Sequence, residues 1–166
     1  MDRSIAPAKP ARTLRTRSAA ETRALGRALG TDALPGTVLA LVGPLGAGKT
    51  QLAKGVAEGL GVRSVVNSPT FVLMNEHQGR LRLFHIDAYR LDDPQDAAAA
   101  GLLDERQADG VTVIEWADRL EGWLPDARLE ITLAVVGDDE RSRTVGWQAH
   151  GPDHALLAAR AFGAGR

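Results

Sequence analysis

The 166-residue sequence contains no cysteine, which excludes disulfides, thiolate nucleophiles and zinc sites with cysteine ligands. Aromatic residues make up only 4% of the chain, so a core must consist mainly of leucine, valine and alanine. No apolar run is long enough to span a bilayer, and the N-terminus lacks the apolar stretch of a secretory signal. From these absences we expect a soluble, cytoplasmic protein.

Net charge is also small, at −1, so the chain as a whole has no general electrostatic attraction for nucleic acids or anionic membranes. Residues 1–30 depart from this balance, with seven basic and two acidic residues. This stretch is consistent either with an arm that touches RNA or with a solvated tail followed by one helix face, and we favour the tail. The sequence thus predicts a disordered basic tail over residues 1–12 and a single domain over residues 13–166.

The most informative stretch is residues 43–50, which read Gly-Pro-Leu-Gly-Ala-Gly-Lys-Thr and match the pattern G-x-x-x-x-G-K-[ST]. Glycines allow successive backbone N–H groups to point at phosphate oxygens, and a following helix adds its positive N-terminal end. Lys49 can reach the β- and γ-phosphates, and the Thr50 hydroxyl can ligate Mg²⁺. The competing interpretation is a glycine-rich turn with a chance lysine. Because an apolar strand pattern precedes the loop and a helical pattern follows it, we infer that the chain binds a nucleoside triphosphate.

A carboxylate follows a second apolar stretch. Residues 111–114 read Val-Thr-Val-Ile, and Glu115 comes directly after them. Nucleotide hydrolases place an acidic residue at the end of a strand beside the loop strand, where it supports the Mg²⁺ that the loop hydroxyl ligates. An apolar strand ending in an acid is common by chance, but the phosphate loop favours the assignment of Glu115 to a metal site with Thr50.

Alternation along residues 81–90 puts His85, Asp87 and Tyr89 on one face of an extended segment. A histidine beside a carboxylate at a strand end is suited to proton handling, water positioning or a metal shell. The other interpretation is a structural hydrogen bond between the histidine and the aspartate. Spacing alone favours that structural bond.

A loop with hydroxyl groups around a proline occupies residues 67–70, which read Asn-Ser-Pro-Thr. Such residues commonly form only a turn. The functional interpretation is a switch loop in which Thr70 touches Mg²⁺ or the γ-phosphate. Spacing does not decide between the two.

The remaining patterns complete an α/β fold. Residues 13–17 are typical of an edge strand, and Ser18 with Glu21 forms a capping box before a helix. A hairpin is predicted over residues 128–136 and 141–148, and a last helix over residues 153–162. We predict a P-loop NTPase-like three-layer sandwich with a mixed, mostly parallel sheet and antiparallel additions, whose site lies at the carboxyl ends of the strands.

Five motifs occur in a defined order. After the phosphate loop come Ser-Pro-Thr-Phe at 68–71, His-Ile-Asp-Ala-Tyr-Arg at 85–90, Gly-Leu-Leu-Asp-Glu at 101–105 and Ile-Glu-Trp at 114–116. This ordered set resembles the TsaE (YjeE) family from about residue 14 to residue 148. Members are small bacterial ATPases that act with the TsaB and TsaD proteins to make N6-threonylcarbamoyladenosine at position 37 of tRNAs. The resemblance implies ATP and Mg²⁺ as cofactors, TsaD-like and TsaB-like partners, and tRNA as the substrate of the complex.

The resemblance also implies roles for individual residues. Thr50 and Glu115 would hold the metal, and Lys49, Asp87 and Thr70 would support hydrolysis. Pro44 and Gln51 depart from residues common in relatives without disturbing a phosphate contact. The positions expected to contact the nucleotide are Gly43, Leu45, Gly46, Ala47, Gly48, Lys49, Thr50, Gln51 and Trp116.

No arginine in the sequence is placed convincingly as a transition-state finger, so we expect slow ATP hydrolysis by the isolated chain and dependence on partner proteins. A small-molecule kinase shares the same loop, although Arg141 and Arg143, the candidates for a basic lid, lie in a predicted hairpin. A third possibility is an assembly factor in which nucleotide binding locks a complex and hydrolysis is incidental. No Asn-Lys-x-Asp motif supports guanine selectivity.

Overall fold

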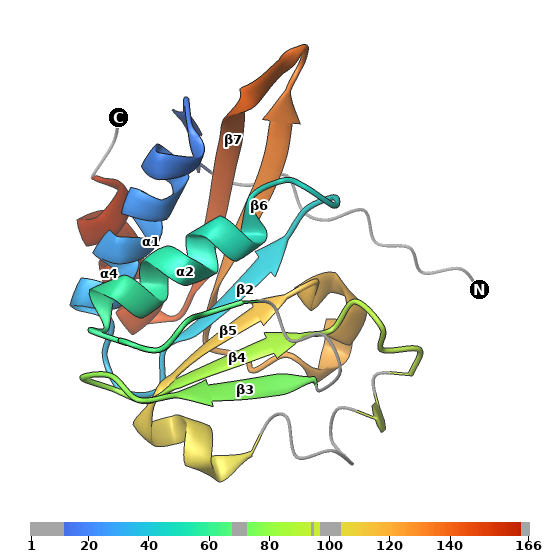
Figure 1. Cartoon of the computed structure of the whole chain (residues 1–166). Coiled ribbons are helices and arrows are strands. Elements are labelled where there is room, and N and C mark those ends of the chain that lie inside the picture. Colours follow the sequence, from blue (N-terminus) through green and yellow to red (C-terminus); the bar gives the residue numbers. More distant parts are fainter. Residues whose placement is uncertain (1–11, 68–72, 94, 97–103, 164–166) are drawn as a thin grey trace.

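A computed structural model describes residues 12–67, 73–93, 95–96 and 104–163. Within this part of the chain, seven strands form one mixed sheet in the order β1-β7-β6-β2-β5-β4-β3 (Figure 1). The predicted α/β fold with antiparallel additions is thereby confirmed. The strands are β1 (Arg12–Thr16), β2 (Val38–Val42), β3 (Met74–His77), β4 (Leu83–Asp87), β5 (Val111–Glu115), β6 (Arg128–Val136) and β7 (Asp139–His150).

The centre of the sheet is parallel. Strand β2 pairs in parallel with β5 and β6, and β5 pairs in parallel with β4. Strands β1, β7 and β3 add antiparallel pairs toward the two edges. In this register Glu115 lies between Leu41 of β2 and Asp87 of β4, so the polar strand ends meet at one edge of the sheet.

Three α-helices cover one face of the sheet: α1 (Ala19–Asp32), α2 (Lys49–Gly59) and α4 (Pro152–Phe162) (Figure 1). The 3-10 helix η2 (Ala117–Trp123) packs on the opposite face, and η1 (Glu105–Asp109) precedes β5. The layers are therefore helices, sheet and a thinner cover of η2 with its neighbouring loops. No helix of the described residues is both long and apolar enough to pass through a bilayer.

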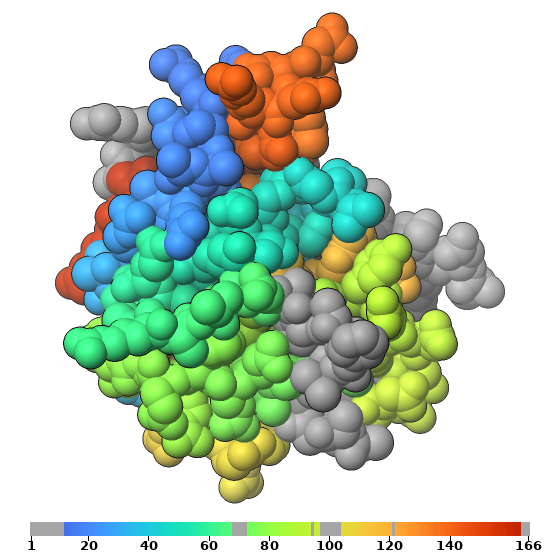
Figure 2. All heavy atoms as spheres, viewed as in Figure 1, coloured from blue at the N-terminus to red at the C-terminus, as the bar shows by residue number. Residues whose placement is uncertain are grey.

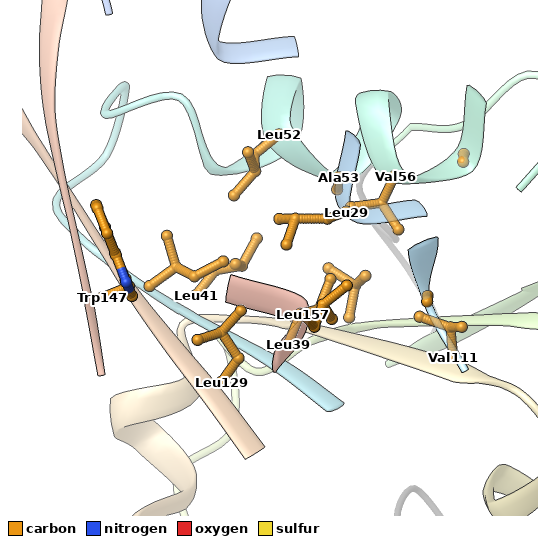
Figure 3. Close-up of a cluster of buried hydrophobic side chains, with 14 of the residues drawn as sticks. Leu29, Leu39, Leu41, Leu52, Ala53, Val56, Val111, Leu129, Trp147 and Leu157 are labelled. Atoms are coloured by element: carbon orange, nitrogen blue, oxygen red, sulfur yellow. The ribbon is translucent and has the colours of Figure 1, made fainter. Parts of the chain in front are cut away.

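Two apolar clusters sit on the two faces of β2. Leu39 and Leu41 belong to the cluster on the helix side, whereas Val38 and Ala40 belong to the cluster under η2. A central parallel strand is buried on both faces, which explains why its sequence is continuously apolar. Figure 3 shows the helix-side cluster, in which side chains of α2 point toward those of β2: Leu52, Val56, Leu39 and Leu41.

Several local predictions at the N-terminal side are confirmed. The Ser18 hydroxyl accepts the backbone N–H of Glu21 at 3.1 Å and so caps α1. Strand β1 lies at the edge of the sheet, paired with β7. Arg12 pairs with Trp147 of β7, so β1 begins at Arg12. We had assigned this residue to the disordered tail. The rest of that tail, residues 1–11, lies outside the described residues.

Helices α1 and α2 approach each other unusually closely through glycines spaced four residues apart. These are Gly26 and Gly30 on α1, and Gly55 and Gly59 on α2. A Cβ atom on any of them would lie well under 3.0 Å from a backbone carbonyl oxygen of the opposite helix. Side chains at these positions would force the helices apart, so the glycines fix the position of α2 above the sheet.

Candidate nucleotide site

The glycine-rich loop, residues 43–50, joins the carboxyl end of β2 to the first turn of α2, as its sequence predicts. Gly46 and Gly48 have backbone φ angles of 78° and 102°, in the left-handed region that side chains disfavour. Gly48 is the N-cap of α2 and leads directly into Lys49. The first backbone N–H groups of an α-helix have no acceptor within the helix, so this end of α2 is suited to an anion.

Lys49 is held under the loop rather than extended into solvent. Its Nζ donates to the carbonyl oxygens of Gly43 and Pro44, at 2.5 and 2.8 Å. The same ammonium lies 3.9 Å from the centre of the Trp116 ring. Burial lowers the pKa of Lys49 below its ordinary value, and nearby carboxylates, chiefly that of Glu115, oppose this shift.

Trp116 adopts a φ of 58°, the one positive value among non-glycine residues in the described chain. A bulky residue in this region is strained, and such strain persists only where the surrounding contacts hold it. Besides Lys49, the Trp116 ring contacts the Tyr89 ring, with centroids 4.8 Å apart. The strained backbone thus places an indole over the loop lysine.

A chain of polar contacts runs beneath the first turn of α2. The Thr50 hydroxyl donates to Oε1 of Glu115 at 2.8 Å, and Nε2 of His85 lies 2.5 Å from Oε2. Glu115 is only 2% exposed and His85 is fully buried. The histidine therefore bonds to Glu115 on the neighbouring strand. Spacing had favoured a structural bond between His85 and Asp87, and the structure shows the bond to Glu115 instead. One carboxylate oxygen faces the loop hydroxyl and the other is fixed by the imidazole.

Thr50 and Glu115 fit a magnesium ion. The Thr50 hydroxyl and the Glu115 carboxylate present two hard oxygen donors 2.8 Å apart, which are the ligand types that would hold Mg²⁺. The hydroxyl proton points to the carboxylate, which leaves the hydroxyl lone pairs available for a cation. Within the described residues, no group of three His, Cys, Asp or Glu forms a complete protein site. Two protein donors would suit an ion that takes its other ligands from water and phosphate oxygens.

A cavity of about 560 Å³ opens beside this polar chain. Its volume is in the range of small-molecule sites. At one end lie the strand-end groups, including Asp87, whose Oδ1 accepts the Tyr89 backbone N–H at 2.9 Å. The other end reaches α1 and the β6–β7 hairpin. The lining residues from the predicted set are Leu45, Gly46, Gly48, Lys49, Thr50, Gln51, Asp87, Glu115 and Trp116.

Two predicted nucleotide contacts do not line the cavity. A Cβ on Gly43 would meet the carbonyl of Leu133, so this residue is needed for the close packing of the loop on β6. Ala47 is fully buried in the helix-side cluster and anchors the loop from below. Thr70, with the Ser-Pro-Thr-Phe motif, lies outside the described residues.

The sequence named Arg141 and Arg143 only as candidates for a kinase lid, and it did not predict that the hairpin lines the nucleotide cavity. Glu140, Arg141 and Arg143 line the cavity from β7, together with Ala19 and Thr22 of α1. The Arg143 guanidinium donates to the carbonyls of the phosphate loop itself. Nearly a hundred positions separate the two segments, and only the pairing of β7 with β6, and of β6 with β2, brings them together.

A parallel-centred α/β sheet, with a glycine-rich loop between its central strand and a covering helix, places this chain among the P-loop NTPase-like proteins. A sequence model of the family described as "Threonylcarbamoyl adenosine biosynthesis protein TsaE" matches residues 16–145. The chain belongs to the TsaE family.

Individual relatives agree with this assignment. The chain is 45% identical over 131 residues to "tRNA threonylcarbamoyladenosine biosynthesis protein TsaE" of Bacillus subtilis, covering 78% of this chain and 82% of the relative. Identity to the Treponema pallidum protein of the same name is 41% over 130 residues, covering 78% and 96%. The crystal structure of Bacillus subtilis YdiB superposes with a TM-score of 0.77 at 36% identity, over 91% of this chain and 93% of that one.

Proposed function

We infer that this protein binds Mg²⁺-ATP in the cavity beneath the loop and hydrolyses it slowly, in the service of tRNA threonylcarbamoyladenosine biosynthesis. The observation that carries the ATPase proposal is the contact of Thr50 with Glu115 at 2.8 Å, directly under the start of α2. A hydroxyl and a carboxylate in this position are suited to a magnesium-bound triphosphate. The biosynthetic role rests on the family and on the names of its relatives.

The chain's own groups divide the work. The start of α2 and the loop N–H groups favour the negative charge of the β- and γ-phosphates. Lys49 would exchange its bonds to the Gly43 and Pro44 carbonyls for bonds to these phosphates. Thr50 and Glu115 would hold Mg²⁺, which when bound neutralises phosphate charge. His85 fixes the orientation of the Glu115 carboxylate. Asp87 lines the cavity at the strand ends, where it is placed to orient an attacking water, with Thr70 as the second candidate.

TsaD-like and TsaB-like proteins are the proposed partners, and position 37 of tRNA is the proposed site of the modification. The exposed edge of the cavity supports a dependence on partners: Tyr89 is 46% exposed and Leu45 at the loop tip is 80% exposed. A partner resting there could exclude water and complete the site. We therefore expect the isolated chain to turn over slowly.

Two other functions compete with this one. A small-molecule kinase would need an acceptor beside the γ-phosphate, and Arg141 with Arg143 from the hairpin could serve as its basic groups. Labelled ATP with a panel of nucleosides and small alcohols separates the two, because phosphate release without transfer favours the ATPase. An assembly factor would use binding alone. For Asp87→Ala, retained ATP binding with loss of repeated tRNA modification would give hydrolysis a resetting role, whereas full modification would favour binding alone.

The direct test compares two lysines of α2. Lys49→Met removes the buried ammonium of the cavity, while Lys54→Met removes a lysine of the same helix that does not line it. We expect the first variant to lose about 10²-fold or more in ATP turnover, as for the loss of a charge-stabilising donor. The second should match the unmodified protein. ATP binding by calorimetry and phosphate release are measured side by side, and equal binding and turnover in both variants would refute the site.

A further inference from the structure

Arg143 of β7 grips the back of the phosphate loop. Its Nη2 donates to the carbonyl of Gly46 at 3.0 Å, and its Nε donates to the carbonyl of Ala47 at 3.1 Å. The third nitrogen, Nη1, donates to the carbonyls of Glu140 and Ser142 in its own hairpin. All three guanidinium nitrogens are thereby engaged with backbone oxygens, and the side chain ties the hairpin to the loop.

Because the peptide bond is planar, a contact with a carbonyl oxygen also fixes the direction of the N–H group in the same peptide unit. In a trans peptide, the carbonyl of one residue and the N–H of the next point in opposite directions. Fixing the Gly46 and Ala47 carbonyls on Arg143 therefore aims the N–H groups of Ala47 and Gly48 away from it. The Ala47 N–H donates to the Pro44 carbonyl within the loop at 3.1 Å, so the Gly48 N–H is the one that this contact would aim at a phosphate. Gly46 and Gly48 have left-handed φ angles and no side chains, so the peptide planes on either side of Ala47 can rotate more freely than those of other residues. Burial of Ala47 and its bond to Pro44 hold the middle of the loop, and the Arg143 contacts restrain the two carbonyls that these do not reach.

The hairpin is positioned to supply this clamp. Strand β7 pairs with β6 on one side and β1 on the other, so its backbone is held within the sheet. Figure 2 shows the orange surface of the hairpin beside the blue surface of α1 and next to the teal surface around the loop. The side chains of Arg143 and of Thr22 on α1 both lie beside Gly48. A Cβ atom on Gly48 would be 3.6 Å from the Thr22 methyl group and 4.0 Å from the Arg143 Nε.

We propose that Arg143 is a positioning residue that orients the peptide planes of residues 46–48 for phosphate binding, acting through its two-pronged contact with the loop rather than through its charge. This proposal rests on the proposed ATP site and adds a residue to it. The four acceptors are all neutral backbone carbonyls, so these contacts do not neutralise the positive charge of the guanidinium. Charge and fork geometry must therefore be separated by experiment.

Lysine separates them. Arg143→Lys retains the positive charge but offers one compact ammonium, which lacks the planar fork that spans two carbonyls. Arg143→Ala removes both. Arg80 provides a matched control, because its Nη2 donates to three backbone carbonyls at the end of α1, those of Gly30, Thr31 and Ala33, away from the cavity. Arg80→Lys thus disturbs an arginine–carbonyl clamp of the same kind elsewhere.

The measurement is the affinity for Mg²⁺-ATP and for inorganic triphosphate by calorimetry, with a thermal melt of each variant. We expect both Arg143 variants to bind both ligands about tenfold or more weakly, the effect of losing hydrogen bonds with a charged donor. Arg80→Lys should bind both ligands as the unmodified protein does, whatever its melting temperature.

Three results would overturn the proposal. Wild-type affinity in Arg143→Lys would make charge, not the fork, the useful property. A loss confined to ATP would place Arg143 on the nucleoside, because inorganic triphosphate tests the loop alone. An equal loss in Arg80→Lys would indicate general loosening of the fold. Failure of the unmodified chain to bind ATP would instead refute the proposed function, so the two failures are distinguishable.

Discussion

The first turn of α2 and the remainder of the same helix bury very different groups. At the N-terminal end, Lys49 and Thr50 contact carbonyls, a carboxylate and an indole. Further along, Gly55 and Gly59 press against the backbone of α1 with no side chain between the helices. One end holds charges out of water, and the other holds only backbone and apolar groups.

This difference explains how the fold remains stable although the site buries charged groups. Burying a charged group is unfavourable unless it is paired and hydrogen-bonded, and even a paired one contributes little to stability. Close packing along α1 and beneath α2 supplies the stability that the polar end lacks. We therefore expect substitutions at the polar end to affect function more than folding, and substitutions at the glycine contact to do the reverse.

The largest effect is expected for Glu115→Gln, which keeps the shape of the side chain and removes its charge. Turnover of ATP should fall about 10²- to 10³-fold, the range seen when a group that stabilises developing charge is lost. The free energy of unfolding should change by less than about 1 kcal/mol, because removal of a buried charge offsets the weaker hydrogen bonds that an amide makes with Thr50 and His85. A large loss of stability with unchanged turnover would show that the polar end of α2 serves folding and not function, which contradicts this account.

Gly55→Ala tests the other end of α2. Its new Cβ would run into the Arg23 carbonyl, so the helices must separate, and we expect destabilisation by about 1–3 kcal/mol. Gly122→Ala is the control, because a Cβ there meets no atom within 4 Å. Urea unfolding of the two variants measures the difference. If Gly55→Ala were as stable as the control, the close helix contact would not carry the stability assigned to it.

A smaller effect is expected at the amino end of β2, far along the strand from the loop. The Val38 backbone N–H donates to Nε2 of the buried His154 at 3.0 Å, so this imidazole must stay neutral at that nitrogen. Burial lowers the pKa of His154 below its ordinary value of 6.5. The unfolded chain then binds the proton more readily than the folded one, so stability is full above pH 6.5 and falls as the pH drops below it.

His154→Gln should flatten this pH dependence without abolishing it, because burial also lowers the pKa of His77. The change amounts to about 1 kcal/mol or less between pH 7.5 and 5.5. Urea unfolding at both pH values measures it. An unchanged slope in the variant would show that His154 does not titrate differently in the folded and unfolded chains.

Local patterns in the sequence predicted much of this architecture. The loop between an apolar strand and a helix, the Ser18 cap and the β6–β7 hairpin each depend on residues close together in the chain. Alternation also placed His85 and Asp87 on the face that carries the site. These features follow from periodicity and turn chemistry, which act over a few residues.

Other features depend on long-range register. The partner of His85 is Glu115 because β4 and β5 are neighbours with Asp87 opposite Glu115, and spacing within one strand cannot reveal this. Arg143 reaches the loop only through two successive strand pairings. The close contact of α1 with α2 does leave a trace in the sequence, because each helix contains two glycines four residues apart. Only the structure shows that the two pairs face each other.

The most direct test of the site is the Mg²⁺ dependence of ATP binding in Thr50→Val, which keeps the shape of the side chain and removes the hydroxyl that contacts Glu115. Calorimetry with Mg²⁺ or with a chelator gives the affinity gained from the ion. We predict that the unmodified chain binds ATP at least about tenfold more tightly with Mg²⁺, and that the variant loses most of this gain. An identical gain in both proteins would contradict a magnesium site at Thr50 and Glu115.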